Sequence, residues 1–205
     1  MKKIAVFASG GGTDFQSVID ANEREAFCEI ACLVASREGI GAIERAKRHD
    51  IPVLIYDKKA YSSLEEMYGA LCAQLVGLGV KYIVLAGYLT ILTEPLLSEF
   101  ADRIVNIHPS LIPSFCGKGF YGLKVHRAVI EYGAKLSGAT VHFVDAGADT
   151  GAIIMQEAVP VLPDDTPESL QERILKVEHR ILPLAVRLLV QGKIHKKGRI
   201  IKVEE

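Results

Sequence analysis

Residues 3–24, KIAVFASGGGTDFQSVIDANER, decide the fold of this chain. Residues 3–8 form a short apolar run typical of a buried strand, and residues 14–24 have the spacing of an amphipathic helix. Between them lie Gly10, Gly11 and Gly12, which let the backbone turn tightly. A strand, a glycine turn and a helix in this order predict the start of a parallel α/β sheet.

The same alternation continues outward from this segment. Strand-like runs occupy residues 30–35, 52–56, 82–86 and 103–107, and helical patterns occupy residues 41–49 and 62–78. Strands separated by helices imply a parallel sheet with right-handed crossovers. We therefore expect an α/β chain with a doubly wound, mainly parallel sheet of the Rossmann-like type.

The second half of the chain has a different pattern. A loop rich in proline and glycine, residues 108–123, precedes a helix at 124–132 and strands at 140–144 and 152–161. We expect Thr166 to cap a long helix at residues 167–191, which Pro183 should kink or break. Residues 193–203 should form a terminal hairpin that turns near Lys197 and Gly198. The prediction is a single domain, residues 1–205, with an antiparallel C-terminal extension.

Composition excludes several classes of protein. The net charge of −1 argues against a nucleic acid or an acidic membrane surface as partner. No apolar run reaches the ~20 residues of a membrane span, and the first apolar run is too short for a signal peptide, so we expect a cytoplasmic protein. The four cysteines form no CxxC pair and no zinc-type spacing, which predicts free thiols and no metal.

The glycine loop has two interpretations. Its bare N–H groups, at the positive end of a helix dipole, favour a phosphate ligand. It is neither a Walker A loop nor a good dinucleotide fingerprint, because no Lys-Ser/Thr follows and the third glycine of the fingerprint is missing. The alternative is a tight turn in which Thr13 or Asp14 caps the helix.

Asn106 and His108 come at the end of the strand at residues 103–107. Pro109 pushes His108 into an extended conformation, and residues i and i+2 of extended chain face the same way. Ligands of open α/β sheets bind outside the carboxyl ends of strands. A carboxamide and an imidazole aimed at one point can stabilise an oxyanion and move a proton. The alternative is an Asn that satisfies loop backbone beside an ordinary His.

Asp145 and Asp149 lie in a glycine-containing loop, where aspartates commonly cap turns. If Asp149 instead approaches His108, it favours the imidazolium and fixes the ring. His142, in an apolar strand, is predicted to be a core or wall histidine, and Glu178 with its neighbour His179 is more typical of a solvated helix face. No partner is assigned to the other three histidines, His49, His126 and His195.

These motifs resemble one family, the folate-dependent phosphoribosylglycinamide formyltransferases. Residues 106–113 (NIHPSLIP) are similar to the family signature. The likeness extends over nearly the whole chain, through residues 9–13 (SGGGT), 85–92 (LAGYLTIL), 142–144 (HFV), 149–151 (DTG) and 178–183 (EHRILP).

The resemblance implies a role for each of these segments. It implies a reaction centre of Asn106, His108 and Asp149, supported by His142 and Ser110. The acceptor's phosphate is expected at Gly11, Gly12, Thr13 and Asp14, and its ribose at Glu178. The folate is expected along Leu89, Thr90, Ile91, Leu92, Leu97, Val144, Asp145 and Gly147. The first hundred residues are then the phosphate and acceptor half, and residues 101–205 the catalytic and folate half.

Three departures from the family pattern stand out. Asp14 replaces a common Asn, and because a carboxylate repels phosphate we expect it to cap the helix. Thr90 replaces a common basic residue, which removes one expected contact to the folate glutamate tail. Residues 115–122 form a loop about four residues longer than usual and add Lys118.

The resemblance implies transfer of a formyl group from 10-formyltetrahydrofolate to the amine of glycinamide ribonucleotide, in purine biosynthesis. Direct attack is expected, because no Ser or Cys beside a base suggests a covalent nucleophile. The alternatives are a formyltetrahydrofolate hydrolase, which usually has an extra N-terminal domain, and a non-catalytic nucleotide-binding module. A methionyl-tRNA formyltransferase should be longer and more basic. The expected partners are the two small substrates, and the expected state is a monomer or homodimer.

Overall fold

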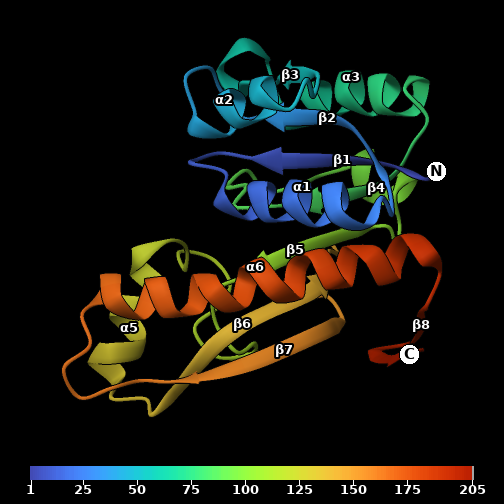
Figure 1. The fold of residues 1–205 in the computed structure, drawn as a ribbon. Helices are drawn as coiled ribbons and strands as arrows, with labels where there is room; N and C mark the ends of the chain where they lie inside the picture. Colours follow the sequence, from blue (N-terminus) through green and yellow to red (C-terminus); the bar gives the residue numbers. More distant parts are fainter. Residues whose placement is uncertain (205) are drawn as a thin grey trace. The chain divides into compact units, whose positions relative to one another are not determined.

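The computed structural model describes residues 1–204, and the chain divides into two compact units between Asn106 and Ile107. The first unit alternates strands and helices as the sequence predicts (Figure 1). Its elements are β1 (Lys3–Ala8), α1 (Thr13–Glu25), β2 (Glu29–Ala35), α2 (Gly41–Arg48), β3 (Val53–Ile55), η1 (Lys58–Ala60), α3 (Leu64–Gly77), β4 (Val80–Leu85), α4 (Leu96–Glu99) and β5 (Ile104–His108).

The strands of this unit are all parallel and follow the order β3-β2-β1-β4-β5. β1 lies at the centre, and its residues from Ile4 to Ala8 are fully buried. A strand with neighbours on both sides and apolar residues on both faces is typical of a parallel sheet. Because the strands are parallel, the glycine loop after β1 and the segment after β4 leave the sheet at the same edge.

The second unit is mainly antiparallel. It contains α5 (Leu123–Tyr132), β6 (Leu136–Phe143), β7 (Ile153–Pro160), α6 (Pro167–Gln191), β8 (Ile194–Lys197) and β9 (Ile200–Val203). β6 pairs with β7 and β8 pairs with β9, both antiparallel. The expected mainly parallel α/β fold with an antiparallel C-terminal extension is therefore confirmed.

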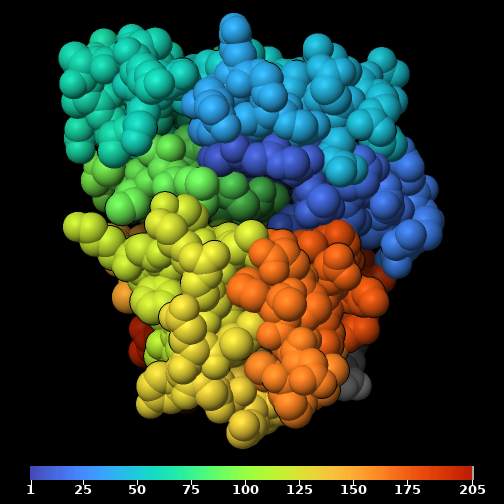
Figure 2. Space-filling view, turned by 90° about the vertical axis from the view of Figure 1, so that its left-hand side faces the viewer, coloured from blue at the N-terminus to red at the C-terminus, as the bar shows by residue number. Residues whose placement is uncertain are grey.

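Helix α6 provides much of the core of the second unit, since it packs against β6, β7 and α5. Side chains of α5 (yellow) and of the start of α6 (orange) lie side by side on the face shown in Figure 2. The Thr166 side chain accepts a hydrogen bond from the Ser169 N–H, and the Ser169 side chain accepts one from the Thr166 N–H, which completes a capping box. The predicted cap at Thr166 is confirmed.

Some boundaries differ from the predictions. The helix does not end at Pro183, so the expectation of a break there is wrong. β6 begins four residues before the predicted strand, and the short helices η1 and α4 were not predicted. The cysteines are free thiols, as expected. No helix within residues 1–204 combines the length and the apolar character that a bilayer span requires.

Candidate active site

Strand β5 presents Asn106 and His108 two residues apart at its carboxyl end. Asn106 is partly exposed, whereas His108 is only 4% exposed. Alternate residues of a strand face the same side, so the predicted common direction of the amide and the ring follows from the observed strand. Burial of the imidazole means that its two nitrogens depend on protein groups for partners.

Both ring nitrogens of His108 face oxygen atoms. Nδ1 lies 3.5 Å from the Asp149 carboxylate, and Nε2 lies 3.0 Å from the backbone carbonyl of Phe115. A carbonyl oxygen only accepts, so Nε2 carries the hydrogen and donates it. The predicted approach of Asp149 to His108, across 41 positions of sequence, is present in the structure.

Asp149 has two further partners. Its Oδ2 accepts a hydrogen bond of 2.8 Å from the Gly117 N–H, and its Oδ1 lies 3.6 Å from Nε2 of His142. His142 is 2% exposed and donates from Nδ1 to the Phe143 carbonyl at 2.7 Å, so it is the wall histidine that the sequence predicts. Asp149 has a φ of 58°, which is strained for a residue with a side chain.

The surroundings shift the pKa values of the central pair. Burial lowers the pKa of His108 below its usual 6.5, although the Phe115 carbonyl and the Asp149 charge act in the opposite direction. Burial alone would raise the pKa of Asp149, but contacts with His142, His108 and Gly117 outweigh it and lower that pKa. At neutral pH the site therefore holds a carboxylate beside a neutral imidazole.

Residues 145–151, the central part of the segment that joins β6 to β7, are here called the Asp149 loop. The Asp145 carboxylate accepts hydrogen bonds from the Gly147 N–H and from the Thr150 hydroxyl, so Asp145 does cap the turn. A Cβ at Gly151 would overlap with the Phe143 carbonyl, which only glycine avoids. The loop backbone is thus tightly constrained next to the carboxylate.

Ser110 and its neighbours organise the chain after β5. The Ser110 hydroxyl donates to the Ser114 carbonyl at 2.7 Å, and its own carbonyl accepts from Thr140 at 2.6 Å. Gln156 of β7 donates to Thr140 and to the Ile112 carbonyl. The supporting position expected for Ser110 is therefore a structural one, and Thr140 and Gln156 are supporting residues that sequence reasoning missed.

His126 of α5 is another residue that sequence reasoning left without a role. It is 1% exposed, and burial, with a smaller effect from its proximity to His108, lowers its pKa to about 4. A buried histidine of this kind stays neutral at physiological pH. No pattern in the sequence distinguishes it from a core residue.

The glycine loop of the first unit is shaped by close packing. Gly12 has a φ of 73°, and a Cβ there would lie 2.7 Å from the Ala42 Cβ. The Arg45 guanidinium donates to the Gly11 carbonyl at 2.8 Å, and the Ala42 N–H donates to the Gly10 carbonyl at 3.1 Å. The loop leads directly into the N-terminus of α1, the arrangement that favours an anion.

The predicted cap of α1 is wrong. Gly12 is the N-cap, and no side chain caps the helix, because the left-handed backbone of Gly12 places Thr13 and Asp14 inside the first turn. Burial raises the pKa of Asp14 from 3.8 to about 6. This carboxyl is therefore partly protonated near neutrality, which reduces its repulsion of a phosphate.

The remaining predicted residues are placed as follows. Glu178 is 5% exposed, so the solvated-face interpretation is wrong for it. In the segment after β4, Leu92 is buried, whereas Leu89 and Ile91 are 59% and 60% exposed and offer an apolar surface. Thr90 and Leu97 are half-buried. In the second unit Val144 is half-buried, and Asp145 and Gly147 are exposed.

Comparison with known proteins gives consistent matches. The model of the formyl transferase family matches residues 2–186. Phosphoribosylglycinamide formyltransferase of Haemophilus influenzae is 38% identical over 201 residues, which cover 98% of this chain and 92% of that protein. Its chloroplastic counterpart in Arabidopsis thaliana is 40% identical over 198 residues, covering 94% of this chain and 67% of the relative.

Other relatives are much longer, and the chain spans only 14% of the trifunctional purine biosynthetic protein adenosine-3 of Drosophila melanogaster, at 41% identity. Among solved structures, glycinamide ribonucleotide transformylase 1 of Symbiobacterium toebii matches with a TM-score of 0.93 and 42% identity, covering all of this chain and 95% of that one. The chain therefore belongs to the formyl transferase family, among its phosphoribosylglycinamide formyltransferases.

Proposed function

We infer that this protein transfers a formyl group from 10-formyltetrahydrofolate to the amine of glycinamide ribonucleotide, a step of purine biosynthesis. The observation that carries the inference is the 3.5 Å contact between the Asp149 carboxylate and His108, beside Asn106 on the same strand end. A carboxylate, an imidazole and a carboxamide are the groups needed to move a proton and to stabilise an oxyanion.

The chemistry follows from the partners of His108. The neutral amine attacks the formyl carbon, a C–N bond forms, and the carbonyl oxygen becomes an oxyanion. The Asn106 amide and the Nε2–H of His108 donate to this oxyanion. Collapse of the intermediate breaks the bond between the formyl carbon and N10 of the folate.

The proton balance requires one transfer. The attacking nitrogen loses a proton, and the leaving N10 gains one. Asp149, held as a carboxylate by its three partners, accepts that proton through water and returns it to N10. In this route the hydrogen bond from Nε2 of His108 to the Phe115 carbonyl must break before Nε2–H can donate to the oxyanion.

Binding of the two substrates is assigned to separate groups. The N–H groups of the glycine loop, Gly11 to Thr13 with Asp14 beside them, bind the acceptor phosphate, and Glu178 binds its ribose hydroxyls. The apolar surface of Leu89 and Ile91, with Thr90, Leu92 and Leu97, contacts the folate, as do Val144, Asp145 and Gly147. Loop geometry at Gly12 and the exposure of Leu89 and Ile91 support these assignments.

The test compares turnover with and without the acceptor. Purified protein is mixed with 10-formyltetrahydrofolate, and deformylation is followed by absorbance, first alone and then with glycinamide ribonucleotide. Turnover only with the acceptor supports transfer. Turnover without it supports the hydrolase, and no turnover in either case supports the nucleotide-binding module.

A pair of variants tests the site itself. Asp149→Asn should fold normally and lose a factor of roughly 10² to 10⁴ in turnover, because it removes the proton acceptor. Asp164→Asn, an exposed carboxylate of the same unit, is the matched control and should keep full turnover. Near-normal turnover of Asp149→Asn would remove Asp149 from the mechanism.

Three further expectations stay predictions. These are a cytoplasmic location, a monomeric or homodimeric state, and a reaction that uses no metal. Two of the plant relatives are named as chloroplastic proteins.

A further inference from the structure

The C-terminal hairpin, β8 and β9, contacts the Asp149 loop. The guanidinium of Arg199, directly after the turn residue Gly198, donates from Nη1 to the Thr150 carbonyl at 2.8 Å. We propose that Arg199 is a positioning residue, which holds the Asp149 loop in the geometry that the reaction needs. The inference rests on the proposed function, since it concerns the same carboxylate.

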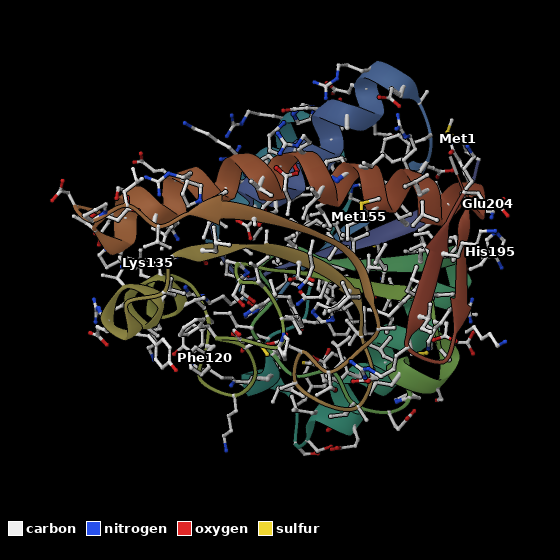
Figure 3. All side chains as sticks on the ribbon, turned by 90° about the horizontal axis from the view of Figure 1, so that it is seen from below. Met1, Phe120, Lys135, Met155, His195 and Glu204 are labelled. Carbon is white, nitrogen blue, oxygen red and sulfur yellow. The ribbon has the colours of Figure 1, made fainter. Side chains whose placement is uncertain are left out.

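The hairpin contacts the chain on both sides of Asp149. Arg199 binds the carbonyl of Thr150, which follows Asp149, and Lys196 lies 5.8 Å from the ring centre of Phe143, the last residue of β6. β9 also packs against β7, the strand that follows the loop in the chain. Figure 3 shows the two strands of the hairpin side by side, with His195 and Glu204 labelled near its open end, where their side chains are 3.0 Å apart.

The loop needs an external contact because its backbone is strained at Asp149. Asp149 has a φ of 58°, and a non-glycine residue keeps such a conformation only when its surroundings hold it there. Towards the N-terminal end of the loop, Asp145 binds the Gly147 N–H. On the C-terminal side, the Thr150 carbonyl is bound by Arg199.

The consequence for catalysis follows from distance. The Asp149 carboxylate is 3.5 Å from the His108 ring, and displacement of a reacting group by about 1 Å can reduce a rate 10²-fold. Arg199 is exposed to solvent, so the loss of its hydrogen bond should loosen the loop rather than unfold it. We expect Arg199→Ala to lower kcat by roughly 3- to 10-fold, the range that corresponds to one exposed hydrogen bond.

The kinetic test separates positioning from general destabilisation. In Arg199→Ala, kcat should fall and the KM for folate should rise, because the same loop is assigned to folate, while the KM for glycinamide ribonucleotide stays within twofold. Arg199→Lys keeps a donor at this place and should restore most of kcat. Lys197→Ala removes an exposed cation at the end of β8, two residues before Arg199, and is the matched control.

A second measurement does not depend on turnover. Amide hydrogen exchange of residues 145–151 should become faster in Arg199→Ala and stay at the wild-type rate in Lys197→Ala. Unchanged exchange and unchanged kcat in Arg199→Ala would overturn the proposal, as would equal effects in both variants. If the wild-type protein lacked transferase activity but exchange still responded to Arg199, the proposed function would fail while the contact between hairpin and loop stood.

Discussion

Replacing Asp14 with Asn should stabilise the protein, and the gain should grow with pH. Burial raises the pKa of Asp14 from 3.8 to about 6, so the folded state holds this proton more tightly than the unfolded state does. Stability is therefore lost as the pH rises from about 4 to beyond 6. From these two pKa values, the free energy of unfolding falls below its low-pH value by about 1.5 kcal/mol at pH 5 and by about 3 kcal/mol at pH 8.

Asparagine has the same shape and no charge, so the variant avoids this loss. The protein lacks tryptophan, and urea unfolding followed by far-ultraviolet circular dichroism at pH 5 and pH 8 is the appropriate assay. The side chain is partly exposed, so the expected extra gain at pH 8 over pH 5 is at most about 1.5 kcal/mol. Asp20→Asn, an exposed carboxylate on the same helix, is the control. A gain for Asp14→Asn that is equal at both pH values would refute the reasoning.

Three other predictions concern the two loops and the central histidine. Gly151→Ala should abolish turnover, because its Cβ would overlap with a backbone carbonyl of β6 and displace the loop; wild-type kcat in a steady-state assay would contradict this. Arg45→Ala removes the 2.8 Å hydrogen bond to the Gly11 carbonyl and should raise the KM for glycinamide ribonucleotide roughly 3- to 10-fold with little change in kcat. An equal rise in the KM for folate would speak against a local effect on the phosphate loop. The pKa of His108, measured by NMR on labelled histidine, should lie below 6.5 and fall further in Asp149→Asn, because the variant loses the charge that favours the imidazolium. A pKa that rises in that variant would show that the carboxylate does not act on the ring.

Local patterns in the sequence predicted the local features of the site. The alternation of a strand places Asn106 and His108 on one side, and the glycine loop follows β1 because tight turns need glycine. The approach of Asp149 to His108 is different in kind, since 41 positions separate them. Only the resemblance to a known family predicted it.

The errors have physical causes. The helix passes through Pro183 because the packing of neighbours such as Leu182 and Val186, both fully buried, outweighs the missing hydrogen bond. Asp14 does not cap α1 because Gly12 starts the helix with a left-handed backbone. Propensity rules do not include either effect.

Three of the contacts that sequence reasoning missed share one property. Arg45 with Gly11, Arg199 with Thr150 and the Phe115 carbonyl with His108 each join a side chain to a backbone oxygen. Every residue carries a backbone carbonyl oxygen, so no residue type marks the partner. Contacts of this kind become visible only when the chain is folded.

Under the proposed function, the Phe115 carbonyl and the substrate compete for the same hydrogen of His108. In the proposed mechanism, the hydrogen on Nε2 reaches the substrate oxygen only after this 3.0 Å hydrogen bond breaks, so the reaction requires the Phe115 carbonyl to move. The oxygen belongs to the main chain, and no exchange of side chain removes it. The strength of this contact therefore depends on the backbone conformation at residue 115. Its φ of 53° already lies in the left-handed region that favours glycine.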